Sequence, residues 1–418
     1  MDYSQILSQQ FNIKEEYAKN IITLLDDGNT IPFIARYRKE MHGSMDDQLI
    51  REFAEKLEYL RGLDKRRDEI RSLIDAQEKL TDEINLALDK AATLSELEDI
   101  YRPYRPKRKT RASIAKEKGL EPLANDILKQ EKGFDPSKSA VDYIDEEKGV
   151  TSVEDAIQGA MDIIAELVSD NAEIRKRIRN LTNANGVLVS VATDEEKDSV
   201  YKNYYDYKEP VKKIAGHRVL AVNRGEKEGF LKVSVETDSE KPLNSIFRAM
   251  ITDKNQLCSD IIREACTDAY QRLIYPSIER EVRNDLTDTA SENAMKVFAV
   301  NLKQLLMQPP VKGKTVLALD PGYRTGCKTA VVDSTGKVLD TTVIYPTHSD
   351  KKIQESKQTL LRLIKKHHVD IISIGNGTAS KETEMFTAET IKEADHPVYY
   401  MVVSEAGASV YSASKLAA

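Results

Sequence analysis

The stretch Thr315–Gly336 constrains the fold more than any other part of the sequence. Val316–Leu319 is a short apolar run that ends on Asp320, directly before a Pro-Gly pair. Because proline and glycine interrupt strands, this pattern predicts a buried strand whose exposed end carries a carboxylate. Thr329–Val332 predicts a second strand, and Asp333–Gly336 predicts the hairpin turn after it.

Asp320 has two interpretations at this stage. A carboxylate at the exposed end of a buried strand can hold a divalent metal ion near phosphate groups. The same side chain can simply cap the Pro-Gly turn by accepting a backbone hydrogen bond. A single Asp-Pro-Gly motif is a weak signal, so the sequence leaves both interpretations open.

The elements after this hairpin define a fold class. They are a third strand at Lys337–Tyr345, a helix at Asp350–Lys366, a strand at Val369–Ile374, a helix at Glu382–Glu393 and a strand at Val398–Val403. The order β-β-β-α-β-α-β is typical of an RNase H-like domain, in which an antiparallel meander precedes parallel strands. The next element should be a helix, for which only residues 406–418 remain, so we expect this domain to be truncated at its C-terminus.

Three strand ends should meet at one edge of the predicted sheet, because parallel strands have their carboxyl ends on the same side. Ligands of such sheets bind beyond these ends. These ends carry Asp320, the Gly375–Thr378 loop and Glu405. A two-metal nuclease needs several carboxylates there, whereas the loop offers the neutral Asn376. We therefore expect Asp320, Asn376 and Glu405 to form a degenerate site, and we assign no catalytic residue, metal or cofactor.

The first three quarters of the chain read as mainly helical, since charged residues make up 31% and glycine and proline are scarce. Residues 216–236 predict a β-hairpin within the helices. The helix pair Ser152–Val168 and Asn171–Leu181, with a basic second helix, is typical of a helix-turn-helix but equally of a solvated face. Gln308–Gly313 predicts a linker. The predicted domains are 1–190, 191–312 and 313–418.

The segment from Tyr101 to Arg111 is the densest cationic run of a chain whose net charge is −7. Two prolines predict an extended loop rather than a helix. The run can contact a phosphate backbone, or it can pair with carboxylates of neighbouring helices. Pairing is favoured for the arginines next to proline, and phosphate contact for Lys107–Arg111. The candidate nucleic-acid-binding residues are Arg102, Arg105, Lys107, Arg108, Lys109 and Arg111.

Several function classes are excluded by simple counts. Three widely spaced cysteines form neither a zinc motif nor a disulfide framework. The N-terminal residues lack the pattern of a signal peptide, and no apolar run approaches the roughly 18–20 residues that span a bilayer. We therefore expect a cytoplasmic protein without a membrane partner.

Longer motifs carry a family resemblance. They are FIARYRKE (Phe33–Glu40), DIYRPYRPKRKTRASIAKEKGLEPLA (Asp99–Ala124), HRVLAVNRGEKEG (His217–Gly229), LALDPGYRTGCKTAVVD (Leu317–Asp333), GNGTAS (Gly375–Ser380) and VVSEAGASVYSAS (Val402–Ser414). Through them, nearly the whole chain resembles the Tex family of bacterial transcription accessory proteins.

The resemblance implies an N-terminal helical region with helix-turn-helix character and a YqgF-type RNase H-like domain that lacks the full carboxylate set of a resolvase. In the family, helix-hairpin-helix and S1 domains follow, and the S1 domain is the main nucleic-acid-binding module. This chain ends before them.

The sequence and the resemblance together predict a monomeric, non-enzymatic scaffold that binds RNA or DNA and works with the transcription machinery. The alternative is a magnesium-dependent nuclease, similar to Holliday-junction resolvases, that uses Asp320 and Glu405. A sugar-kinase-like phosphotransferase fits less well, because bulky Tyr323 and Arg324 follow the glycine where such enzymes cradle phosphate.

Overall fold

The computed structural model describes residues 2–106, 108–252, 254–307 and 311–412. The chain divides into two compact units, Met1–Ala290, here called the helical unit, and Ser291–Ala418, here called the sheet unit. Most described residues are helical and the second unit contains a mixed sheet, which confirms the predicted fold class. Within the described ranges, no helix is both long enough and apolar enough to cross a membrane.

The helical unit begins with short helices that pack around one long helix. Its elements are α1 (Tyr3–Phe11), α2 (Glu15–Asp26), α3 (Ile31–Tyr37), α4 (Asp47–Asp75), α5 (Asp82–Lys90) and α6 (Leu94–Tyr101). The Asp46 side chain caps α4 by accepting from the Leu49 backbone N–H at 2.7 Å. Apolar residues at three- and four-residue steps along α4 are buried, so one stripe of this helix faces its neighbours: Ile50, Phe53, Leu57, Leu60 and Leu63.

A second helical layer surrounds α10 (Val153–Asp170). It contains α7 (Arg111–Glu117), α8 (Glu121–Lys129), α9 (Pro136–Ala140), α11 (Ala172–Asn185), α13 (Glu240–Met250) and α14 (Gln256–Asp268). Gly159 lets α10 approach the start of α8, because a Cβ atom there would lie 2.3 Å from Cδ1 of Leu120, the residue that precedes this helix. Short 3-10 turns are η1 (Lys39–Met41), η2 (Arg102–Tyr104), η3 (Val141–Tyr143), η4 (Lys202–Tyr204) and η6 (Ile391–Glu393).

The Tyr275-Pro276 pair does not end the helix that precedes it, although proline commonly ends helices. A π-helical segment, η5 (Ala269–Ile274), joins α14 to α15 (Tyr275–Leu306). The π segment already changes the backbone hydrogen-bond register before Pro276, so the missing proline N–H does not end the helix. The boundary between the two units, at Ala290, falls within α15, and the predicted domain boundaries at 190 and 312 remain predictions. Part of the predicted linker, Gln308–Pro310, lies outside the described residues.

The hairpin predicted at residues 216–236 is wrong in its first half. Residues 216–227 form helix α12 (Gly216–Lys227), whereas β3 (Leu231–Glu236) is the expected second strand. Val219 and Val222 are buried three residues apart, so they face one side of a helix, and this packing overrides their preference for strands.

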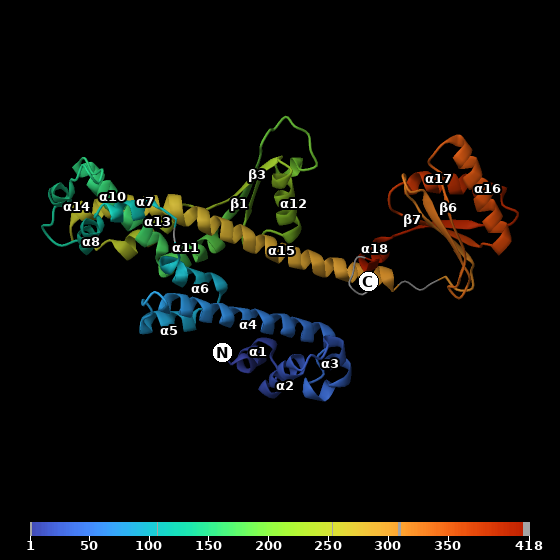
Figure 1. The fold of residues 1–418 in the computed structure, drawn as a ribbon, viewed down its shortest axis with the longest axis horizontal. Helices are drawn as coiled ribbons and strands as arrows, with labels where there is room; N and C mark the ends of the chain where they lie inside the picture. Colours follow the sequence, from blue (N-terminus) through green and yellow to red (C-terminus); the bar gives the residue numbers. More distant parts are fainter. Residues whose placement is uncertain (1, 107, 253, 308–310, 413–418) are drawn as a thin grey trace. The chain divides into compact units, whose positions relative to one another are not determined.

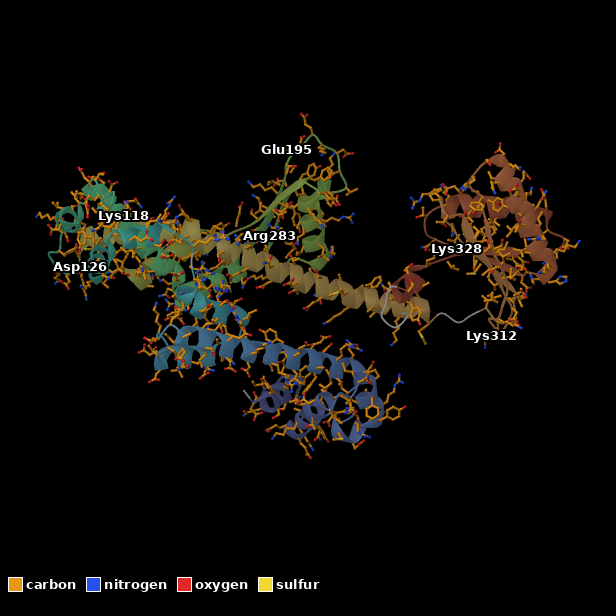
Figure 2. All side chains as sticks on the ribbon, viewed as in Figure 1. Lys118, Asp126, Glu195, Arg283, Lys312 and Lys328 are labelled. Atoms are coloured by element: carbon orange, nitrogen blue, oxygen red, sulfur yellow. The ribbon has the colours of Figure 1, made fainter. Side chains whose placement is uncertain are left out.

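The true partner of β3 is β1 (Val187–Ala192), which the sequence analysis left unassigned. It pairs antiparallel with both β3 and β2 (Asp206–Pro210), in the order β2-β1-β3. Figure 1 shows α12 beside this small sheet. Arg283 of α15 reaches β3, where its Nη1 donates to the Val233 carbonyl at 2.9 Å (Figure 2).

The sheet unit has the predicted strand and helix order. Its elements are β4 (Val316–Asp320), β5 (Cys327–Val332), β6 (Val338–Ile344), α16 (Asp350–His367), β7 (Ile371–Gly375), α17 (Ser380–Thr390), β8 (Tyr399–Val403) and α18 (Ala406–Ser412). The strands lie in the order β6-β5-β4-β7-β8, antiparallel among the first three and parallel among the last three. Helices α16 and α17 pack beside this sheet (Figure 1), where Leu360, Ile364 and Phe386 join its buried core.

Candidate nucleic-acid surface and sheet-edge site

The parallel strands β4, β7 and β8 end at one edge of the sheet, as predicted. A hollow of about 800 Å³ lies there, lined among others by Asp320, Gly375 and Glu405. Asn376 belongs to the same edge, because its Oδ1 accepts the Glu405 backbone N–H at 3.1 Å. The parallel register therefore brings the three predicted strand ends together from positions up to 85 residues apart in the sequence.

The Glu405 side chain lies directly against the glycines of the β7 loop. A Cβ atom at Gly375 would be 1.4 Å from Glu405 Oε1, and one at Gly377 would be 2.9 Å from Oε2. Oε1 is buried and has no hydrogen-bond partner among the described residues. Gly375 and Gly377 thus leave the space that the Glu405 carboxylate fills, a role that the sequence analysis did not find. Two glycines flanking one residue at the end of a strand are the signal for such a close approach.

Asp320 is mostly solvent-exposed and has a cationic neighbour. Lys328 stands opposite Asp320 in the β4–β5 register, with its Nζ 3.7 Å from Asp320 Oδ2 (Figure 2). The lysine therefore supplies positive charge at the position where a nuclease would use a metal ion. The sequence analysis missed Lys328, although the hairpin pattern alone places it across from Asp320.

A buried thiol lies beneath the same edge. Cys327, the first residue of β5, is 1% exposed. Burial raises the pKa of its thiol to about 12, and the nearby negative charges of Asp320 and Glu405 act in the same direction. The thiol is therefore neutral at physiological pH, which makes it a poor nucleophile and a poor metal ligand.

The ligand chemistry of the edge is sparse. Asp320 and Glu405 contribute one carboxylate each and Asn376 is neutral, so this edge offers oxygen ligands for at most a weakly held cation. Among the residues that the structure describes, no group of three or more His, Cys, Asp or Glu side chains is arranged to hold a metal ion.

In the cationic segment, the two arginines next to proline contact carboxylates within the helical unit. Arg102 Nε donates to Asp170 Oδ1 at 3.2 Å, and Arg105 forms an ion pair with Glu98. Both contacts agree with the internal-pairing interpretation. The segment is also more helical than predicted, because η2 occupies its first part and Arg111 begins α7.

The second half of the segment is exposed. Arg108 and Arg111 form no ion pair with a carboxylate of the described residues, while Lys109 makes an exposed pair with Glu117 at 3.6 Å. Lys107 lies outside the described residues. A hollow of about 700 Å³, here called the basic groove, is lined by the basic side chains Arg105, Arg108, Lys109 and Lys116 and the acidic side chains Glu117, Glu166 and Asp170.

The predicted helix-turn-helix pair corresponds to α10 and α11, but three of the four basic residues of α11 pair with carboxylates of the helical unit, and only Arg177 is exposed and forms no ion pair with the described residues. Lys176 pairs with Glu96 at 2.8 Å, and Arg175 and Arg179 are both buried. Both arginines bind Asp99 of α6. Arg175 Nε donates to Asp99 Oδ1 at 2.5 Å, and Arg179 Nη2 donates to Asp99 Oδ2 at 2.6 Å. This geometry gives no support to α11 as a DNA-reading helix, since a recognition helix needs its side chains free for base edges.

The fold defines the class of protein, an RNase H-like domain that follows a helical region. Comparison with protein-family models agrees with this class. The Tex-like protein N-terminal domain matches residues 1–75, the Tex central region-like model matches 131–298, and the Tex protein YqgF-like domain matches 314–418. The chain belongs to the Tex family.

Similar proteins extend beyond the length of this chain. The Bacillus subtilis protein YdcI is 45% identical over all of this chain and 59% of its own length. Transcriptional accessory protein Tex of Neisseria gonorrhoeae is 40% identical, over all of this chain and 55% of its own length. The human S1 RNA-binding domain-containing protein 1 is 33% identical over 99% of this chain and 43% of its own length. The chain thus spans a little over half the length of its bacterial relatives.

Proposed function

We propose that this chain is the nucleic-acid-associated scaffold portion of a transcription accessory protein. The observation that carries this proposal is the exposed end of the cationic segment, where Arg108 and Arg111 make no ion pair among the described residues. Unpaired guanidinium groups on a surface are suited to phosphate oxygens, which Arg contacts bidentately. The names of the relatives, a transcriptional accessory protein and an S1 RNA-binding domain protein, support the same function.

Neutralising this surface is expected to weaken binding and to reduce its salt dependence. The variant R108Q/K109Q/R111Q removes up to three phosphate contacts, so the slope of log K against log salt for single-stranded RNA should fall in magnitude by about 2. Fluorescence anisotropy with a labelled single-stranded RNA and a DNA duplex, across a salt series, measures this slope.

The matched control is K129Q/K138Q/K148Q, which removes three exposed lysines of the same unit that pair with nearby aspartates. It lowers the net charge equally, so a similar loss of slope in both variants would show that binding follows total charge rather than the basic groove. Wild-type protein that binds neither probe at low salt would contradict the proposal itself.

We further propose that the sheet edge is catalytically degenerate. Support comes from the neutral Asn376 and from Lys328 beside Asp320. Wild-type protein is expected to leave branched, single-stranded and double-stranded substrates intact in the presence of Mg²⁺ or Mn²⁺, as gel electrophoresis of labelled substrates would show. Cleavage that D320N abolishes and D333N, a change in the β5–β6 turn, leaves intact would instead establish the nuclease alternative.

A further inference from the structure

A second basic hollow lies in the helical unit where α6, α11 and α15 meet (Figure 1). Its volume is about 340 Å³, and it is here called the arginine pocket. Four guanidinium groups line it: Arg102, Arg105, Arg175 and Arg280. The hydroxyl of Ser277 and the amide of Asn284 add neutral polar groups, and the carboxylates in the wall are Glu98, Asp99 and Glu281.

The carboxylates of this pocket are already occupied by arginines. Both oxygens of Asp99 accept from Arg175 and Arg179. Both oxygens of Glu281 accept from the same two arginines, at 2.8 and 2.9 Å, and Glu98 pairs with Arg66 and Arg105. Each acid in the wall therefore serves two guanidinium groups, which leaves donors of the pocket without an acceptor.

Arg175 shows this excess of donors directly. The residue is 1% exposed, and its Nε and Nη2 atoms are hydrogen-bonded, but its Nη1 is buried without a partner among the described residues. Buried donors are nearly always satisfied in proteins, so an orphaned guanidinium N–H in a pocket wall indicates a missing acceptor.

Two further arginines add positive charge to the pocket wall: Arg102, which pairs with Asp170, and Arg280. Burial and the charge of Arg175 lower the pKa of the Arg102 guanidinium, despite its contact with Asp170. Arg280 of α15 is exposed and forms no ion pair with a carboxylate of the described residues. Several guanidinium groups around one hollow favour a polyvalent anion between them.

We propose that the arginine pocket binds a phosphate monoester group or free phosphate. Guanidinium forks match tetrahedral oxyanions in a bidentate manner, and a terminal phosphate presents three oxygens with about two negative charges. Arg105 lines both this pocket and the basic groove. A phosphorylated end of a bound oligonucleotide therefore has a route from the groove into the pocket, although the pocket itself does not depend on the groove binding nucleic acid.

The test is isothermal titration calorimetry of the 418-residue chain with sodium phosphate, with chloride balancing ionic strength. We expect saturable binding that R280Q weakens at least fivefold. The control R177Q removes an exposed arginine of α11 that does not line the pocket, and should change affinity less than twofold. Because Arg280 is exposed, its removal should not disturb folding, which a melting curve verifies.

Two further arms identify the source of the phosphate. Adenosine monophosphate tests a free nucleotide, and a short oligonucleotide with either a 5′-phosphate or a 5′-hydroxyl tests a strand end. The variant R108Q/K109Q/R111Q should retain phosphate binding, since none of its three residues lines the arginine pocket, so failure of the proposed function and failure of this site are distinguishable. Absence of saturable binding with every phosphate probe, or equal weakening by R280Q and R177Q, would overturn the proposal.

Discussion

Replacing Asp99 with alanine is expected to lower the free energy of unfolding of the helical unit by about 3–5 kcal/mol, the range found when one partner of a buried ion pair is removed. The Asp99 side chain is 6% exposed and accepts hydrogen bonds from both Arg175 and Arg179. Its loss would leave Glu281 as the remaining carboxylate of the network for two buried guanidinium groups. The energetic cost arises from those uncompensated charges rather than from the cavity.

Urea unfolding followed by far-UV circular dichroism measures this effect, since the chain contains no tryptophan. D68A is the matched control, because it also removes an aspartate bound to an arginine, but one that is 73% exposed. Exposed pairs contribute at most about 1 kcal/mol. D99N keeps the side-chain shape and one acceptor oxygen, so it should fall between the two. Equal stability of D99A and D68A would show that the buried network contributes little.

The same network explains why the helix-turn-helix hypothesis could not be decided from the sequence. Residues 171–181 show a basic helix, but the acids that neutralise it come from α6 and α15. Those acids lie between 76 and 106 residues away along the chain. Periodicity reports which residues share a face and contains no information about which distant carboxylate meets them.

The sheet unit was predictable because its signals are local. Each strand is an apolar run bounded by turn residues, and the parallel arrangement follows from the helices between β4, β7 and β8. Once that order is known, the meeting of Asp320, Asn376 and Glu405 follows from topology alone. The two glycines of the β7 loop signal a close approach, but the sequence does not tell that Glu405 is the side chain that fills it, because this depends on where α18 begins.

The hairpin error shows the opposite case. The run Val219–Val222 has the composition of a strand, but it lies in helix α12, from which Val222 packs against the small sheet. Strand preference reflects half-buried packing on a pleated surface, and a helix that packs on such a surface offers valine the same burial. The unassigned run Val187–Ala192 supplied the strand that β3 required.

Cys327 should make the sheet unit less stable as the solution becomes more alkaline. The pKa of its thiol is about 12 in the folded protein, compared with 9.0 without the surrounding structure. Below pH 9 both states keep the proton and the thiol has no effect on stability. Between pH 9 and 12 only the unfolded state loses it, so the free energy of unfolding falls by about 1.4 kcal/mol per pH unit at most.

Alkylation by iodoacetamide, followed by mass spectrometry of the Cys327 peptide, tests the raised pKa. The rate is expected to rise about a hundredfold between pH 9 and 11, because the thiolate fraction grows tenfold per unit below the pKa. In urea, where the protein is unfolded, the alkylation rate of the same peptide should level off above pH 9. D320N removes a negative charge that raises the thiol pKa, so its rate should level off at a lower pH than the wild type. If the alkylation rate of Cys327 in the folded protein already levels off near pH 9, the edge of the sheet is open to water. The buried environment assigned to Cys327 would then be wrong.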